Sequence, residues 1–121
     1  MDTILIVEDD ESYRSMLMYA LESQGYKVFV APGGLEAKNI LQELKPNLII
    51  TDLIMEDMDG FEVIIHAKKQ NPEIKIIAIS GGGQLQTEKH LDTAKELGAE
   101  YSIMKPFSLD EITNAVDSLL K

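Results

Sequence analysis

The stretch Ile4-Leu5-Ile6-Val7-Glu8-Asp9 places two acidic residues directly after four consecutive apolar ones. A short run of this kind, rich in β-branched residues and without polar alternation, predicts a strand covered on both faces, as in parallel sheets. The pattern returns where Asp52 closes Leu48-Ile49-Ile50-Thr51 and where Lys105-Pro106 closes Tyr101-Ser102-Ile103-Met104. Charged residues are therefore expected at the carboxyl ends of buried strands, the edge at which open α/β sheets bind ligands.

Apolar runs of strand length alternate with amphipathic segments of helix length along the chain. Strict alternation with short connections predicts right-handed crossovers and a parallel sheet with helices on both faces. We therefore expect an α/β fold with a doubly wound five-stranded parallel sheet, strand order 2-1-3-4-5, and five helices. Its switch point lies between the first and third strands. The expected strands are Thr3–Val7, Lys27–Val30, Leu48–Thr51, Lys75–Ile79 and Tyr101–Met104.

The segments expected to be helical carry apolar residues at helical spacing and signals for their ends. Ser108 predicts the N-cap of the last helix, and Glu111, three residues later, completes a capping box. His66 and His90 fall on the polar sides of their segments, with no second ligand at metal-binding spacing, and are expected to face solvent. The expected ends of the first four helices are Gly25, Pro46, Asn71-Pro72 and Gly98.

Length and composition limit the possible classes of protein. With 121 residues the chain can form one core, and we expect residues 1–121 to be one domain with no output domain attached. Lys and Arg number 11 against 21 Asp and Glu, and the formal charge of −10 argues against nucleic acid or an anionic membrane as a direct partner. The chain has no cysteine, no signal peptide and no apolar run that could span a membrane, so a cytoplasmic protein is expected.

The charged residues at the expected sheet edge have the chemistry of a cation site. Glu8, Asp9 and Asp52 would repel one another unless a cation joins them, and their oxygens suit Mg²⁺ when waters and phosphoryl oxygens complete its shell. Lys105 supplies a point charge that can pair with Asp52 or with a bound oxyanion, and Ser80 ends the fourth strand. A carboxylate, a divalent cation, a lysine and a hydroxyl are the groups that phosphoryl transfer to an aspartate needs.

Four separated motifs occur in a characteristic order. They are Glu8-Asp9, then Asp52-Leu53 with Met58-Asp59-Gly60, then Ser80-Gly81, then Lys105-Pro106-Phe107. Together they make the whole chain resemble the receiver domain of the two-component response-regulator family. The resemblance implies a flavodoxin-like fold of the receiver type. It also implies a signalling domain rather than an enzyme, because its chemistry is its own phosphorylation and dephosphorylation.

The resemblance implies a role for each residue at the sheet edge. Asp52 would accept a phosphoryl group from a phosphohistidine on a sensor histidine kinase or a histidine phosphotransfer protein. Lys105 and Ser80 would hold the phosphoryl oxygens, and the Lys105–Pro106 peptide bond would be cis. Phosphorylation would change the affinity of a downstream protein partner for the face built by the fourth helix, fifth strand and fifth helix. The implied Mg²⁺ ligands are Glu8, Asp9, Asp52 and the backbone carbonyl of Ile54.

Two of the departures from the family pattern leave other functions open. Glu56 stands where the family commonly has proline. Ser102 stands where the family usually has a Tyr or Phe whose rotamer changes on activation. Tyr101 is adjacent, but in a strand it should face the opposite side. A receiver-like scaffold that acts without phosphorylation is therefore one alternative. A phosphatase with Asp52 as transient nucleophile is another, although its usual signature needs an acid where Ile54 stands. Both a free-standing regulator and a part of a longer regulator or hybrid kinase are compatible with the sequence.

Overall fold

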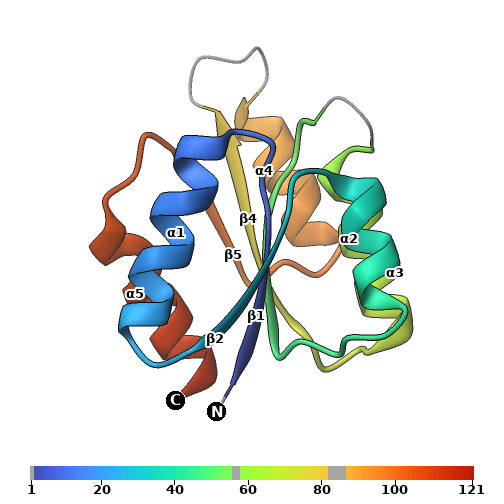
Figure 1. Ribbon diagram of the computed structural model, residues 1–121. Helices are drawn as coiled ribbons and strands as arrows, with labels where there is room; N and C mark the ends of the chain where they lie inside the picture. Colours follow the sequence, from blue (N-terminus) through green and yellow to red (C-terminus); the bar gives the residue numbers. More distant parts are fainter. Residues whose placement is uncertain (1, 56–57, 82–86) are drawn as a thin grey trace.

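The structure is a computed structural model that describes residues 2–55, 58–81 and 87–121 (Figure 1). Within these residues strands and helices alternate along the chain, as the sequence predicts. The strands are β1 (Thr3–Val7), β2 (Lys27–Ala31), β3 (Leu48–Asp52), β4 (Lys75–Gly81) and β5 (Tyr101–Lys105). The helices are α1 (Glu11–Ser23), α2 (Gly34–Leu41), α3 (Gly60–Gln70), α4 (Thr87–Glu96) and α5 (Leu109–Leu120).

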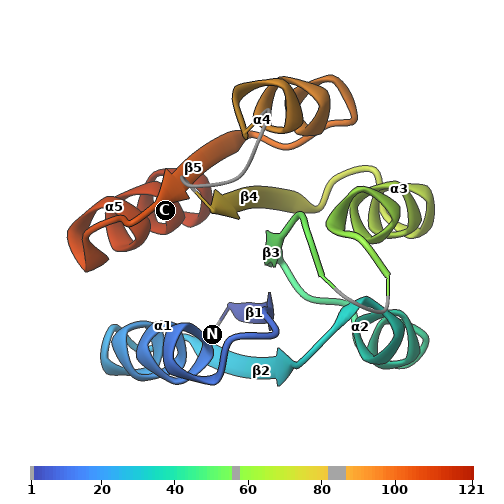
Figure 2. The same ribbon diagram turned by 90° about the horizontal axis from the view of Figure 1, so that it is seen from above.

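The strands form one parallel sheet of order β2-β1-β3-β4-β5, which confirms the predicted order. Viewed along the strands, α1 and α5 cover one face of the sheet, and α2, α3 and α4 cover the other (Figure 2). The chain leaves β1 toward one side of the sheet and β3 toward the opposite side. The carboxyl ends of these two neighbouring strands therefore form the switch point, where such sheets bind ligands.

Side chains of β1 alternate between two apolar cores, one on each face of the sheet. Ile4 and Ile6 belong to the core under α1 and α5, whereas Leu5 belongs to the core under α2, α3 and α4. All three side chains are fully buried, and each contributes about 1.5–3 kcal/mol through its removal from water. Burial on both faces accounts for the uninterrupted apolar runs. It also means that a charged residue can first appear where the strand leaves both cores.

Within the described residues, three helices begin at capping side chains. Asp10, Asp59 and Ser108 are the N-caps of α1, α3 and α5, and each accepts a hydrogen bond of 3.0–3.1 Å from the backbone amide three residues later. The cap at Ser108 confirms the predicted start of the last helix. Each cap supplies an acceptor that the first helical turn lacks, and contributes about 1 kcal/mol.

The helix ends agree with the sequence except at α2. Gly25 and Gly98 follow α1 and α4 with φ of +95° and +118°, a left-handed conformation that favours glycine. The end of α3 is also as predicted. Helix α2 stops at Leu41, several residues before Pro46. Residues 42 and 43 form a turn instead, in which each amide bonds to the carbonyl three residues back while the chain approaches the proline.

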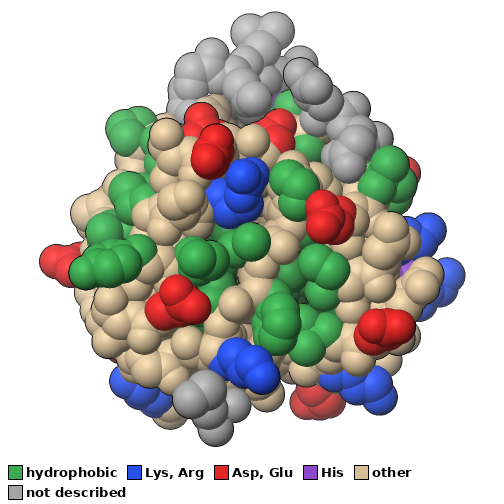
Figure 3. All heavy atoms as spheres, viewed as in Figure 1, with side chains coloured by type: hydrophobic (Ala, Val, Ile, Leu, Met, Phe, Trp, Pro, Cys, Tyr) green, Lys and Arg blue, Asp and Glu red, His purple; other side chains and the backbone are tan. Residues whose placement is uncertain are grey.

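Figure 3 shows the side of the molecule on which β2 is the edge strand. Apolar side chains are interspersed with charged ones across this side. Acidic side chains gather near the top of the view, beside the edge where the strands end. None of the helices in the described part of the chain has the length and apolar character needed to cross a lipid bilayer.

Tyr26, just before β2, connects that strand to α5. Its ring is buried, and its hydroxyl donates a 2.6 Å hydrogen bond to Asp117 Oδ1. Burial, followed by the hydrogen bond and charge of Asp117, raises the pKa of Tyr26 to about 12. The folded protein therefore keeps this proton at a pH where an unfolded tyrosine, with a pKa near 10, has lost it.

We expect Tyr26→Phe to lower the free energy of unfolding by about 1–2 kcal/mol at neutral pH, because Asp117 loses the hydrogen bond from the phenol hydroxyl. The difference from wild type should be complete below about pH 10 and shrink as the pH rises through about 12, since only the wild type ionises there. Urea unfolding at neutral and alkaline pH measures both effects. Tyr19→Phe is the matched control, because Tyr19 is 75% exposed. An equal loss in the control would contradict the assignment to Asp117.

Candidate functional site

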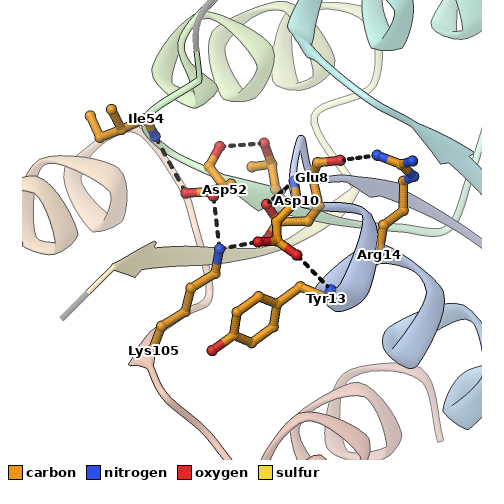
Figure 4. A network of polar contacts seen from close by, with 8 residues as sticks. Glu8, Asp10, Tyr13, Arg14, Asp52, Ile54 and Lys105 are labelled. Atoms are coloured by element: carbon orange, nitrogen blue, oxygen red, sulfur yellow. Dashed lines mark hydrogen bonds and ion pairs between the residues drawn. The ribbon is translucent and has the colours of Figure 1, made fainter. Parts of the chain in front are cut away.

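Charged side chains meet where β1, β3 and β5 end (Figure 4). Glu8 directly follows β1, whereas Asp52 and Lys105 are the last residues of β3 and β5, one residue beyond the predicted strand ends. One carboxylate oxygen from each of Glu8, Asp9 and Asp52 lies within 4.8 Å of the others. Glu8 and Asp52 are buried and Asp9 is exposed, so the cluster is closed on one side and open to water on the other.

Lys105 joins the two buried carboxylates. Its Nζ lies 3.0 Å from Asp52 Oδ2 and 2.7 Å from Glu8 Oε1. Burial disfavours the ammonium, but the contacts with Glu8 and Asp52 outweigh burial and raise the pKa of Lys105 above its ordinary value. The Lys105–Pro106 peptide bond is cis, as the resemblance implies. The predicted pairing of this lysine with Asp52 is therefore present, with Glu8 as a second partner.

Glu8 is the most deeply buried acid of the cluster, with 1% of its surface exposed. Burial raises the pKa of Glu8 to about 7; the charge of Asp52 acts in the same direction, while Lys105 and the Asp10 amide oppose it. The Asp10 amide donates a 3.1 Å hydrogen bond to Glu8 Oε2. Among the described residues, no donor completes a well-oriented hydrogen bond to Oε1, although the Lys105 ammonium is close to it.

This arrangement fits a hard divalent cation. One ammonium faces three carboxylates, so negative charge remains that Lys105 alone does not neutralise. The buried Oε1 of Glu8 has acceptor capacity left, and the raised pKa of Glu8 shows that its ionised form is costly without a further positive charge. Carboxylate oxygens are the ligands that Mg²⁺ takes from proteins, with waters completing its octahedron.

The connection after β3 folds tightly back on Asp52. The Thr51 hydroxyl donates to the Asp52 carbonyl at 2.8 Å, and the Ile54 amide donates to Asp52 Oδ1 at 3.4 Å. The Gly60 amide, where α3 begins, donates to the Leu53 carbonyl at 2.7 Å. A Cβ atom on Gly60 would lie 2.1 Å from the Asp52 carbonyl oxygen, so this approach requires glycine. These contacts of the described residues fix the backbone that carries Asp52.

The other residues predicted for the site lie at the same sheet edge. Ser80 is fully buried in β4 and follows Ile79, which pairs with Asp52 across the sheet. Ile54 brings its peptide group next to the Asp52 carboxylate through its amide, and its side chain is exposed. Glu56, the departure from the family pattern in this loop, lies outside the described residues. Glu8, Asp9, Asp52 and Lys105 thus form one cluster, with Ser80 and Ile54 at its edge.

Two residues of α1 belong to the site although the sequence did not single them out. The Tyr13 ring lies under Lys105, with its centroid 4.4 Å from Nζ. Arg14 Nη1 donates a 3.0 Å hydrogen bond to the Glu8 carbonyl and so holds the chain at the end of β1. Their position in the sequence could have indicated them, because both lie in the first turn of the helix that follows Glu8-Asp9. Asp10 is the N-cap of this helix.

Tyr101 does not replace the aromatic side chain that the family usually has at the position of Ser102. Its hydroxyl lies 3.0 Å from Ser118 Oγ on α5, and the side chain is 40% exposed. Ser102 is the next residue of β5 and therefore points to the other face of the sheet. The predicted orientation of Tyr101 is confirmed, and any switch in this chain works without an aromatic residue at position 102.

A family model described as the response regulator receiver domain matches residues 4–117 of this chain. Sporulation initiation phosphotransferase F of Bacillus subtilis is 34% identical over 119 residues, which cover 98% of this chain and 94% of that protein. Sensor kinase CckA of Brucella abortus is 33% identical over 121 residues, which cover 98% of this chain but 12% of that protein. The beryllofluoride-activated NtrC4 receiver domain dimer is similar in structure, with a TM-score of 0.87, 31% identity, and coverage of 98% of this chain and 96% of that one.

Proposed function

The chain belongs to the response regulator receiver domain family, and on this premise we propose that it accepts a phosphoryl group on Asp52 in a Mg²⁺-dependent reaction and thereby switches partner binding. It is a signalling domain of the two-component type. The proposed donor is a phosphohistidine on a sensor histidine kinase or a histidine phosphotransfer protein. The similarity to a sensor kinase and to a phosphotransferase supports this choice of donor.

The observation that carries the proposal is the 3.0 Å contact between Lys105 Nζ and Asp52 Oδ2 beside two further carboxylates. A buried ion pair that serves the fold alone gains nothing from additional like charges, which only raise its cost. Clusters of this kind reduce stability until a ligand balances them, and proteins keep such clusters where function requires them.

In the proposed reaction an oxygen of the Asp52 carboxylate attacks the phosphorus of the donor phosphohistidine. The O–P bond forms as the P–N bond breaks, and the histidine nitrogen keeps the electron pair of the broken bond and takes up a proton. Lys105, whose ammonium already contacts Asp52, would hold one phosphoryl oxygen, and the Ser80 hydroxyl would donate to another. Catalysis of this kind consists of positioning and charge neutralisation.

Glu8, Asp9, Asp52 and the carbonyl of Ile54 are the ligands that we propose for Mg²⁺. When bound, the ion neutralises the carboxylates and the charge of the incoming phosphoryl group. Glu8 would supply a buried oxygen that has acceptor capacity left, and Asp9 an exposed oxygen that solvent reaches directly.

The face that we propose for the downstream protein partner is built from α4, β5 and α5. Tyr101 and Met104 of β5 are 40% and 42% exposed, so this strand presents apolar surface that a partner could cover. Because β5 ends at Lys105, a change at the lysine would be transmitted along this strand to the surface. A shallow groove between β5 and α5 is lined by Tyr101, Ser102, Ile103, Glu111, Asn114, Ala115 and Ser118.

We expect acetyl phosphate and Mg²⁺ to add one phosphoryl group to the wild type and none to Asp52→Asn, because the amide is not a nucleophile. Intact-mass spectrometry with and without Mg²⁺ measures the adduct. Asp59→Asn is the matched control, since the Asp59 side chain caps α3 by accepting the Glu62 amide at 3.0 Å, and asparagine keeps this acceptor. The control should be labelled like the wild type.

Each other outcome points to a different function. An adduct that persists in Asp52→Asn would place the phosphoryl group on another residue and contradict the proposal. A folded protein with no adduct, no Mg²⁺ binding and no beryllofluoride complex would favour a scaffold. Release of many phosphates per protein molecule would favour a phosphatase. Beryllofluoride is a suitable probe because it activates the similar NtrC4 receiver domain.

A further inference from the structure

Tyr13 lies against the ammonium of Lys105 (Figure 4). The 4.4 Å between Nζ and the ring centroid is within the range of a cation–π contact. The ring is half-buried and packs against Phe107, with the two ring centroids 5.5 Å apart. The ammonium therefore has two carboxylates and one aromatic ring as neighbours.

Glu8, one of the two acids that contact Lys105, is linked to Tyr13 through Asp10. The Tyr13 amide donates to Asp10 Oδ1 at 3.0 Å, in the N-cap of α1. The Asp10 amide donates to one oxygen of Glu8, and the other oxygen of Glu8 contacts Lys105. The contacts therefore form a closed ring through Glu8, Asp10, Tyr13 and Lys105. A movement of α1 and its N-cap away from the lysine would therefore break the hydrogen bond from the Asp10 amide to Glu8.

The aromatic ring of Tyr13 differs from the other neighbours of the ammonium because it has no carboxylate oxygen that could bind a metal cation. A lysine ammonium on its flexible four-carbon stem has many positions open to it. Glu8 and Asp52 have oxygens that a hard cation takes as ligands, so they are withdrawn from Lys105 when such a cation binds. The aromatic face of Tyr13 has no such oxygen and can remain in contact with the ammonium.

We propose that Tyr13 is a positioning residue, whose ring face keeps the Lys105 ammonium at the sheet edge where phosphoryl transfer to Asp52 needs it. This inference rests on the proposed function of Asp52. Tyr13 acts through the lysine and makes no contact of its own with the phosphoryl group. Its hydroxyl is not required, because the attraction comes from the face of the ring.

Three variants separate the aromatic ring from the packing of α1. Tyr13→Phe keeps the ring, and Tyr13→Leu keeps an apolar side chain of similar reach without the ring. Met16→Ala shortens a neighbour in the shallow groove that Tyr13, Met16, Phe107 and Ser12 line. With acetyl phosphate and Mg²⁺, we expect Tyr13→Phe and Met16→Ala to be labelled within about twofold of the wild-type rate and Tyr13→Leu about fivefold more slowly, in line with a partly shielded cation–π contact.

A second measurement reports the contact itself. The ring current of Tyr13 should shift the ε-methylene protons of Lys105 upfield in the NMR spectra of the wild type and Tyr13→Phe. The upfield shift should be lost in Tyr13→Leu and kept in Met16→Ala. A change in helix packing alone would not produce this pattern.

Three results would overturn the inference. They are equal slowing in Tyr13→Leu and Met16→Ala, an upfield shift of Lys105 that survives in Tyr13→Leu, and slow labelling of Tyr13→Phe. If the wild type is not labelled on Asp52, the proposed function fails by itself. The NMR shift still decides the contact between Tyr13 and Lys105, because it needs no phosphoryl donor.

Discussion

Gly60→Ala is expected to lower the free energy of unfolding by at least about 3 kcal/mol, the upper range for an overpacked site. The added methyl group would lie 2.1 Å from the Asp52 carbonyl oxygen and 2.8 Å from the Leu53 Cα. Both are backbone atoms, so no rotamer change relieves the overlap, and either α3 or the end of β3 has to move. Because such a movement displaces Asp52, labelling by acetyl phosphate should fall together with stability. Urea unfolding and intact mass measure the two effects.

Gly25→Ala is the control for the loss of a glycine as such. Gly25 has a φ of +95°, and no atom lies within 4 Å of a Cβ placed there. The cost is therefore backbone strain alone, about 1–2 kcal/mol, and labelling of Asp52 should be unchanged. Equal losses of stability in the two variants would contradict the close approach of Gly60 to Asp52. Wild-type stability and labelling in Gly60→Ala would contradict it as well.

Lys105→Met is expected to lower the free energy of unfolding by about 3 kcal/mol in the presence of a chelator, since removal of one partner leaves buried charges uncompensated. Glu8 and Asp52 would then face each other without the ammonium that lies 2.7 Å and 3.0 Å from them. Methionine keeps most of the apolar stem of the lysine, so the lost charge dominates the effect. Uptake of a proton by Glu8, whose pKa is already about 7, limits the cost.

Magnesium should reverse part of this loss. The lysine and a divalent cation compete for the same carboxylates, so the variant should bind Mg²⁺ more tightly than the wild type and gain more stability from it. Urea unfolding with a chelator and with Mg²⁺ measures the difference. Lys69→Met, which changes an exposed lysine of α3, should stay within about 0.5 kcal/mol of the wild type under both conditions. An identical response of Lys105→Met and the wild type to Mg²⁺ would argue against competition between Lys105 and a cation for these carboxylates.

The sheet and the charged sheet edge could be predicted because the information for them is local. Each strand is an apolar run whose end is visible as a change to charged residues, and the strand order follows from general rules for alternating strands and helices. Ser108 could be identified as a cap from the residue three positions later. The end of α2 could not, because a proline marks where a helix cannot continue and leaves open how much earlier it stops.

Side-chain contacts between different helices and strands could not be predicted from the sequence. His66 and His90 were expected to face solvent, and this prediction was wrong. Each histidine is half-buried, and one of its ring nitrogens is shielded from solvent. The centroid of the His90 ring lies 5.9 Å from that of Phe61 on α3. Helical periodicity predicts which side of a helix packs on the sheet, but it does not predict which side chains contact a neighbouring helix. Tyr13 was missed for the same reason, since its contact depends on how Lys105 leaves β5 over α1.

The position of Lys105 in the last strand of the sheet has a consequence for synthesis of the chain. A ribosome releases β1 and β3, which pair with each other, long before it releases β5. Until then Glu8 and Asp52 meet without the ammonium that balances them, and their repulsion opposes the stable pairing of the two central strands. The nascent sheet is therefore disfavoured until its fifth strand arrives. The repulsion between Glu8 and Asp52 thus makes the last strand of the sheet a requirement for stable pairing of its two central strands.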